Sequence, residues 1–464
     1  MSLPTKTVED PLTTAAAPAS VSPAARIATV GFGMLYALLV VLTYNSLLIT
    51  RFEYWGLGPL HPSFEVGVVA WALALLPLPL LPVALRRPSA VFVWLIYLLL
   101  YVPAELLAPA VTDPTLGSRE LLQLSGVTAV GMFLIVGASL LPHRTFQRRR
   151  LSLRGATRLA TALTVALLGY FLLHEGGHVS FSRSLTEIYD ARADLIERTA
   201  LGGSALVLYA QLWLAGFCFP VLSSLFWQRK QRIRCGISAL GPVVLFAVNG
   251  LKGMLLSPVL FAGLLVASFR NGKWFGPTLA AGLSALLALG WVAETLFPEN
   301  GFWYTAVLHF RLIAVPSELY VQYFDFFRDH PLTYLSHVSG FSTLIHYPYD
   351  APLPEVIGNF YYGVEQDGAN ATSWAMDGLA SFGLYGVVLS SLMIGGVLFV
   401  LDWLAEGADP RIVGLACGYV TIILLASSLF TTLLSGGLLL LLVSLVWWPA
   451  AGSTSEPAAP GSAT

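Results

Sequence analysis

The stretch NATSWAMDGLASFGLYGVVLSSLMIGGVLFVLDWLAE (residues 370–406) decides the fold class of this chain. Between Asp377 and Asp402 it contains no charged side chain, and it is longer than the about 20 apolar residues that cross a bilayer. Gly378, Gly383 and Gly386 permit close helix packing. The sequence therefore predicts a membrane-spanning helix, with Asp377 as an acid in its first turns.

The same apolar character extends over the whole chain. Of its 464 residues 56% are hydrophobic and 11% are charged, whereas soluble domains carry roughly 25% charged residues. Three Cys, two of them inside apolar runs, do not make a disulfide framework. This composition excludes a soluble globular enzyme and a disordered chain. We predict an all-α polytopic membrane protein with about twelve transmembrane helices, near residues 27–50, 64–85, 89–110, 120–141, 155–173, 203–226, 235–249, 253–269, 275–297, 374–402, 411–429 and 433–449.

The spans make one transmembrane domain, residues 27–450, between two tails. Residues 1–26 and 451–464 are expected to be disordered. Lys and Arg of short loops favour the cytoplasmic side. With both termini cytoplasmic, 17 of the 25 Lys and Arg lie in inner segments, including the clusters at 144–158 and 229–234. We therefore expect residues 298–373 to form one large outer loop.

The outer loop 298–373 holds four of the eight His of the chain and is rich in aromatic side chains. Inside it, SELYVQYFDFFRDHP (317–331) has an apolar stripe at helical spacing and an opposite polar stripe that includes Glu318 and Asp325. This pattern predicts an amphipathic helix on the outer membrane face. Its carboxylates are either merely solvated, or one of them points into a cavity as a general base.

Two isolated cations are candidates for binding an anion. Lys252, in the turn NGLKG (249–253), is the only charge between Arg234 and Arg270. A charge so close to hydrocarbon is a functional hypothesis by default, and snorkelling to the surface is the alternative. Arg311 carries the guanidinium that binds phosphate oxygens best, and a salt bridge to a loop carboxylate is its alternative. Together the two cations suit a pyrophosphate group.

The sequence HEGGH (174–178) matches the H-E-x-x-H zinc pattern of metalloproteases. Gly176 and Gly177 weaken the helix that the two His would need, by about 1 kcal/mol each. The motif lies at the outer mouth of the fifth expected span, and only Asp377 offers a third ligand. We therefore expect a hydrated helix end and no metal.

The C-terminal half resembles the bacterial oligosaccharide repeat-unit polymerases of the O-antigen type. The resemblance covers about residues 235–406. It consists of GLKG opening a span, R-x-x-x-x-P-S before an aromatic helix, HPLTYLSHVSGF, VIGNFYYG, N-A-x-x-W-A-x-D-G-x-x-x-F-G-x-x-G and a closing LDWL. The family position that matches Lys252 is usually Arg, so the bidentate fork is missing here.

The resemblance implies a glycosyltransferase that needs no metal or other cofactor, in the cytoplasmic (inner) membrane of a bacterium, with its active site on the periplasmic side. It would transfer a polyprenyl-pyrophosphate-linked oligosaccharide to a second lipid-linked repeat unit. Membrane lipid, flippase and chain-length regulator proteins would be its other partners, and nucleic acid would not. Lys252 and Arg311 would bind the pyrophosphate. His337 is the favoured base because histidine titrates near neutrality, with Asp325 and Glu318 as rivals. The candidates for contacts to the sugar are Tyr361, Asn370 and Asp377.

Three other functions stay open at this stage. Twelve spans is also a transporter count, so a transporter or flippase for a lipid-linked or anionic substrate is the main alternative, although no repeated halves are found. A ligase or another lipid-linked sugar transferase is hardest to separate from a polymerase. A membrane metalloprotease using HEGGH is the third alternative.

Overall fold

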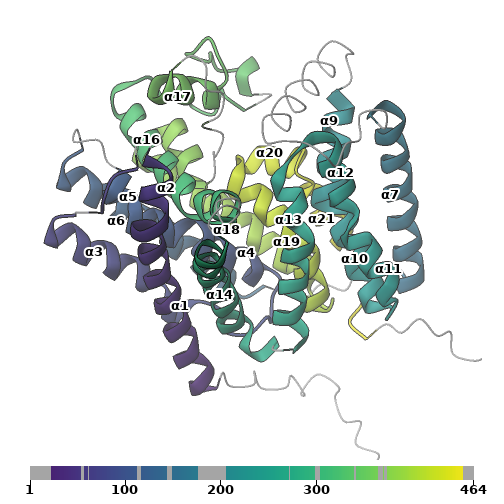
Figure 1. Cartoon of the computed structure of the whole chain (residues 1–464). Helices are drawn as coiled ribbons and strands as arrows, with labels where there is room; N and C mark the ends of the chain where they lie inside the picture. The colour runs from purple at the N-terminus through teal and green to yellow at the C-terminus, as the bar shows by residue number, and fades with distance from the viewer. Residues whose placement is uncertain are drawn as a thin grey trace, which may run out of the picture.

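The computed structural model describes residues 22–53, 57–60, 62–111, 116–143, 149–175, 205–270, 272–297, 304–338, 341–363, 369 and 374–452. All regular elements in these residues are helical, which confirms the predicted all-α class (Figure 1). In chain order they are α1 (Pro23–Thr43), η1 (Tyr44–Leu48), α2 (Ile49–Arg51), α3 (Phe64–Leu75), η3 (Leu78–Leu80), α4 (Ser89–Ile96), η4 (Tyr97–Tyr101), α5 (Val102–Val111), α6 (Ser118–Leu140), α7 (Leu153–Glu175), α9 (Ala205–Trp213), η6 (Leu214–Cys218), α10 (Phe219–Gln228), α11 (Arg232–Ala239), α12 (Gly241–Asn249), α13 (Lys252–Leu265), η7 (Val266–Arg270), η8 (Gly272–Trp274), α14 (Phe275–Leu296), η9 (Thr305–Ala314), α16 (Val315–Asp329), η10 (Phe341–Thr343), α17 (Leu353–Tyr362), α18 (Trp374–Ala405), α19 (Pro410–Ala426), α20 (Leu429–Leu434) and α21 (Leu438–Leu445).

Eight helical segments of the described chain are long and apolar enough to cross a membrane. Each coincides with one of the predicted spans, so the chain has the character of a multi-pass membrane protein. The eight candidate spans are Pro23–Arg51, Ser89–Ala110, Ser118–Leu140, Leu153–Glu175, Leu206–Gln228, Gly253–Arg270, Gly272–Leu296 and Trp374–Ala405.

The other four predicted spans are shorter or broken. Residues Phe64–Leu80 and α19 are apolar helical segments of fewer than 18 residues. The predicted span 235–249 is divided into α11 and α12 at Leu240, where Pro242 cannot donate a backbone hydrogen bond. The predicted span 433–449 is divided into α20 and α21 by Gly437, which has a φ of +87°. Twelve spans and the orientation therefore stay predictions.

A fully buried segment forms the centre of the bundle. The candidate span Ser89–Ala110, made of α4, η4 and α5, is buried along almost its whole length. A helix that is apolar all round is expected in such a position. Around it α18 packs along α6, α1 packs along α14, and α16 packs against both α5 and α18. Most of the candidate site residues therefore lie on elements that pack around this central segment.

The helix labelled α18 folds back on itself, which the sequence did not predict. Phe382 and Gly383 have non-helical backbone angles, and Gly383 has a φ of +60°. Trp374 Nε1 donates to Ser391 Oγ at 2.6 Å, although 17 residues of straight helix would separate them by about 25 Å. The prediction of one continuous span over 374–402 is therefore wrong. A half-helix, residues 374–381, packs back against the start of a span that begins at Leu384.

Two glycines make this fold-back possible. A Cβ added to Gly378 would overlap the carbonyl group of Gly386, and a Cβ added to Gly386 would overlap the carbonyl group of Gly378. The two backbones therefore touch directly, as small residues at helix contacts permit. The close packing predicted for these glycines is present, but it joins two parts of one helix and not two separate spans.

The predicted helix of residues 317–331 is present, but it is buried among other helices, and its position on the outer membrane face stays a prediction. The helix α16 covers the predicted segment, but almost every residue from Ser317 to Phe327 is buried, on the polar stripe as well as the apolar one. In Figure 1 it lies below α17 and beside α18. The polar stripe is buried because hydroxyl groups of α17 satisfy it, as the next section shows.

Candidate functional site

Glu318 on α16 lies in a buried hydrogen-bond network with α17. Glu318 is only 3% exposed. The Tyr362 hydroxyl donates to Glu318 Oε1, and Gln322 Nε2 donates to the same oxygen at 3.3 Å and to the Tyr362 oxygen at 2.7 Å. A buried carboxyl group needs such partners, because leaving it unpaired is costly. The alternative that the carboxylates of this helix are all solvated is therefore wrong for Glu318.

Burial changes the acidity of Glu318. It raises the pKa of the carboxyl group to about 7, and the hydrogen bonds from Tyr362 and Gln322 reduce the increase without cancelling it. The helix α16 lies outside the eight candidate spans. With this pKa the carboxyl group can both accept and release a proton near neutral pH.

Asp325, two helical turns further on, is held by charges and by a second tyrosine. The Tyr361 hydroxyl donates to Asp325 Oδ2 at 2.8 Å. Arg328 Nη2 lies 3.5 Å from Asp325 Oδ1 and 3.1 Å from Asp329 Oδ2. The Tyr361 hydroxyl, predicted to contact sugar, is thus bound to a carboxylate. We name Glu318, Gln322, Asp325, Tyr361 and Tyr362 the acid–tyrosine cluster.

His337 and Asp377, which are 40 residues apart in sequence, form a buried pair. His337 Nε2 lies 2.8 Å from Asp377 Oδ1, and the two side chains are 8% and 7% exposed. The other ring nitrogen, Nδ1, lies 2.8 Å from Thr333 Oγ1, which is itself 3.0 Å from the Ala380 carbonyl oxygen. Both ring nitrogens of the predicted base are therefore in contact with polar groups.

With Asp377 as a carboxylate, the single proton of Thr333 allows two states of this arrangement. Thr333 has one hydroxyl proton, which points either to the Ala380 carbonyl or to His337 Nδ1. In the first case both ring nitrogens carry protons, and His337 is an imidazolium ion beside the Asp377 carboxylate. In the second case His337 is neutral and donates only from Nε2. Asp377 accepts a hydrogen bond from Nε2–H in both states, so it orients the imidazole ring.

The break in α18 positions His337. Thr333 N donates to Ala380 O at 2.8 Å, and Tyr334 N donates to Ser381 O at 3.1 Å. These two carbonyls are at the end of the half-helix, where intrahelical partners are lacking. Tyr334 and Leu335 have φ values of 50° and 69°, which cost about 1–3 kcal/mol each in residues with a side chain. The bonds to α18 offset this strain and bring the following residues to Asp377.

The helix α16 lies between the two groups of residues. Its polar stripe faces α17, while Tyr323 donates to the Ala369 carbonyl at 3.4 Å, close to the start of α18. Burial and the charge of Asp377 raise the pKa of the Tyr323 hydroxyl. One helix therefore contacts both the acid–tyrosine cluster and the pair His337–Asp377.

The predicted pyrophosphate-binding pair is not tested by these contacts. The turn NGLKG is present as expected: α12 ends at Asn249, Gly250 has a φ of +67°, and α13 begins at Lys252. The Lys252 side chain lies outside the described part of the structure, and so does Asn370. Arg311 is exposed on η9. Whether the two cations meet therefore stays a prediction.

Only the first part of HEGGH is described. His174 Nδ1 lies 2.9 Å from the Tyr170 carbonyl oxygen, and Glu175, the last residue of α7, is buried. Gly176, Gly177 and His178 are outside the described residues. Among the residues that are described, no three His, Cys, Asp or Glu side chains are grouped as a metal site requires.

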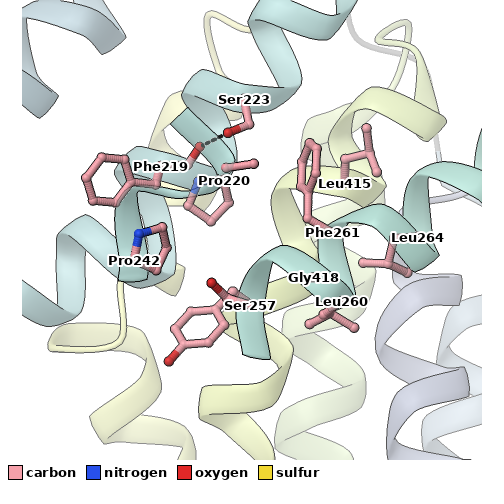
Figure 2. A pocket seen from close by; sticks show the side chains of 12 residues that line it. Phe219, Pro220, Ser223, Pro242, Ser257, Leu260, Phe261, Leu264, Leu415 and Gly418 are labelled. Atoms are coloured by element: carbon pink, nitrogen blue, oxygen red, sulfur yellow. Dashed lines mark hydrogen bonds between the residues drawn. The ribbon is translucent and has the colours of Figure 1, made fainter. Parts of the chain in front are cut away.

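A small apolar pocket lies elsewhere in the bundle (Figure 2). Its walls come from α10, α13 and α19, with Phe219, Phe261 and Leu415 among the side chains that line it. It shares α13 with Lys252 but contains none of the predicted site residues. The hydroxyl side chains of Ser223, Ser257 and Tyr419 also line it.

Two residues of the site were missed at the level of sequence. Thr333 and Tyr362 were part of quoted motifs, HPLTYLSHVSGF and VIGNFYYG, but no role was given to either. Thr333 precedes His337 by four residues, which could have indicated a contact only if the segment had been helical. Nothing in the local sequence distinguishes Tyr362, which binds Glu318, from Tyr361, which binds Asp325.

Comparison with known proteins finds no match: no family model, no curated protein and no solved structure is similar to this chain.

Proposed function

We propose that this protein is a membrane glycosyltransferase that polymerises polyprenyl-pyrophosphate-linked oligosaccharide repeat units on the outer face of the cytoplasmic membrane. The multi-pass helical fold supports the membrane location, and the motifs of residues 235–406 support the reaction. The single observation that carries the proposal is the contact between His337 and Asp377. These residues belong to two separate motifs of the resemblance, and the chain brings them together in one buried pair.

The pair suits the removal of a proton from an acceptor sugar hydroxyl. With Asp377 bound to Nε2–H, the lone pair of a neutral His337 is on Nδ1, where Thr333 now sits. When the acceptor hydroxyl takes the place of Thr333 at Nδ1, the Thr333 proton turns to the Ala380 carbonyl, so the Thr333–His337 hydrogen bond is exchanged for one from the acceptor. In this proposal Asp377 is a positioning residue for His337 and does not bind sugar. General base catalysis of this kind contributes about 10²–10⁴-fold in rate.

The remaining groups have roles that fit their positions. Glu318, whose pKa is about 7, is the alternative base, and Asp325 is the weaker rival because Arg328 and Tyr361 already occupy it. Lys252 and Arg311 would stabilise the departing pyrophosphate, a contribution of about 3–4 kcal/mol to the barrier for each such contact. No nucleotide sugar is needed, because the pyrophosphate ester supplies the driving force.

The test is genetic complementation read out by polysaccharide length. Cells that lack the protein should accumulate lipid-linked single repeat units and lose the long chains of a gel ladder. The wild-type gene should restore the ladder, while His337→Gln and Asp377→Asn should restore at most about 1% of it. The matched control is His330→Gln, because His330 follows α16 and stacks on Phe326, and it forms no ion pair with an acid among the described residues.

The result that would overturn the proposal is an unchanged ladder in cells that lack the protein. If the ladder is lost but His337→Gln restores it fully, His337 is not the base, and Glu318→Gln becomes the decisive variant. Lys252→Ala combined with Arg311→Ala tests the cationic pair separately, since it should abolish long chains without changing the His337–Asp377 contact.

A transporter or flippase is the second candidate function, and one observation favours it. The fold-back of α18 leaves a half-helix and an unwound step at Phe382–Gly383, which is typical of substrate sites in transporters. Translocation of a labelled lipid-linked oligosaccharide across proteoliposomes, abolished by Asp377→Asn, would support this function. Polymer formation by the purified protein from lipid-linked units would decide for the glycosyltransferase.

A further inference from the structure

Five arginines gather where α7 begins, α10 ends and α11 begins. Figure 1 shows these three helix ends side by side, and α10 packs against both neighbours. Lys230, with a φ of 60°, makes the tight reversal between α10 and α11, closed by Gln231 N donating to Phe226 O at 2.9 Å. We name this group the basic corner; it consists of Arg154, Arg158, Arg229, Arg232 and Arg234.

The chain segments that carry the basic corner contain no acidic residues. The chain has no Asp or Glu between Glu120 and Glu175, nor between Glu197 and Glu294. Within the described part of the chain, no ion pair involves any of the five arginines. Like charges held together without a counterion destabilise the fold. A bound anion would therefore stabilise the basic corner.

Arg229 is the centre of the corner. Burial lowers the pKa of its guanidinium, and Arg154, Arg234 and Arg158 lower it further, which shows that the four charges are near each other. Its Nε atom is buried and has no hydrogen-bond partner among the described residues. Arg232 instead makes a cation–π contact, with its guanidinium carbon 3.3 Å from the centre of the Trp227 ring. An unsatisfied guanidinium nitrogen between other guanidiniums is the donor set that a phosphate group binds.

The sides of the basic corner are apolar. Ile233 and Ile237 of α11 are 81% and 68% exposed, and Leu159 of α7 is also exposed. A soluble phosphate would gain nothing from these side chains, whereas a phospholipid would contact them with its acyl chains. The corner also lies at the ends of the helices that the sequence places on the cytoplasmic side, where anionic lipids bind basic pockets between helices.

We propose that the basic corner is a binding site for the headgroup of an anionic phospholipid, with the phosphate at Arg229 and the acyl chains against α7 and α11. The site is independent of the glycosyltransferase proposed above, because its helices α7, α10 and α11 carry no residue of the His337–Asp377 pair or of the acid–tyrosine cluster. Its role is to neutralise the charge of the corner and so to stabilise the packing of α7, α10 and α11.

The test is lipid binding to the purified full-length protein in detergent, followed by native mass spectrometry. Phosphatidylglycerol should bind at least ten times more tightly than phosphatidylcholine. Arg158→Gln combined with Arg229→Gln should lower the affinity for phosphatidylglycerol at least tenfold. The matched control removes two exposed cations of the same predicted membrane side, Arg270→Gln with Lys273→Gln, and should change the affinity less than twofold.

Thermal unfolding separates a lost site from a lost fold. In the absence of lipid the double variant of Arg158 and Arg229 should unfold at the same or a higher temperature, because it removes repulsion. Phosphatidylglycerol should then raise the Tm of the wild type but not that of the variant. Equal binding of the two lipids by the wild type, or undiminished phosphatidylglycerol binding by the variant, would overturn the proposal. Displacement of phosphatidylglycerol by millimolar glycerol 3-phosphate would assign the corner to a soluble phosphate and would overturn the lipid assignment.

Discussion

The helices α16 and α11 differ in which kind of side chain they bury and which they expose. On α16 the polar residues Glu318 and Gln322 are buried, while on α11 the apolar residues Ile233 and Ile237 are exposed. Periodicity shows that a helix has two faces, but it does not show which face other chain segments cover. In a membrane protein an apolar face can meet lipid, and a polar face can be buried wherever hydrogen-bond partners come from another helix.

The largest loss of stability is expected from a substitution at the fold-back of α18, next to α16. Gly378→Ala places a Cβ against the Gly386 carbonyl, so the half-helix must move, at a cost of about 3 kcal/mol. Thermal unfolding in detergent should show a clear loss of Tm. The control Gly396→Ala lies on the same helix with no atom within 4 Å of the new Cβ, and should leave the Tm unchanged. Equal Tm values for both variants would contradict the fold-back.

A slightly smaller effect is expected inside the acid–tyrosine cluster. Glu318→Ala leaves the buried Tyr362 hydroxyl without its acceptor and the Gln322 amide with only Tyr362, which should cost about 2–3 kcal/mol of stability. Asp329→Asn on the same helix is the control, because that side chain is mostly exposed and should change stability by less than about 0.5 kcal/mol. If the two variants have the same Tm, the polar stripe of α16 is solvated after all.

The next effect in size is the pH dependence of stability, to which Glu318 of α16 contributes. Because the pKa of Glu318 is raised to about 7 in the folded protein, the folded state holds a proton that the unfolded state has released. Stability from this group is fully present below about pH 4.3 and is lost as pH rises through 7, by about 2.5 kcal/mol between pH 5 and 8. Tm measured over that range should fall in the wild type and fall less in Glu318→Gln. A wild-type Tm that rises over the same range would oppose the assignment.

The smallest effect is expected on α11. Ile237→Ala removes apolar atoms that face outward, so lipid or detergent takes their place and the free energy of unfolding should change by less than about 0.5 kcal/mol. The same truncation at a packed position costs about 2–5 kcal/mol. A loss of that larger size, measured by thermal unfolding, would show that this face packs against protein and is not exposed.

Much of the fold could be predicted because a span is a local property. About 20 apolar residues cross a bilayer whatever their neighbours are, so each of the eight candidate spans was identified from its own composition. The turn at NGLKG was predictable for the same reason. The fold-back of α18 was not, because the close contact of Gly378 with Gly386 depends on a bend at Gly383 that composition does not reveal.

The candidate site was predicted residue by residue but not as an arrangement. His337, Asp377, Glu318, Asp325 and Tyr361 were all chosen from the sequence. Their pairing was not, since His337 reaches Asp377 over 40 residues through a strained loop, and Tyr361 reaches Asp325 over 36. Asp377 and Tyr361 were given contacts to sugar, and the structure gives both of them protein partners.

The sequence by itself determined that this protein is a helical, multi-pass membrane protein, because hydropathy and charge act on each segment independently. It also determined which polar side chains are available for chemistry. Only the tertiary structure decided which of them are buried and with whom, because burial depends on segments distant in the chain. A carboxyl group such as Glu318 has a pKa of about 7 only where another helix removes water from it and provides its hydrogen bonds.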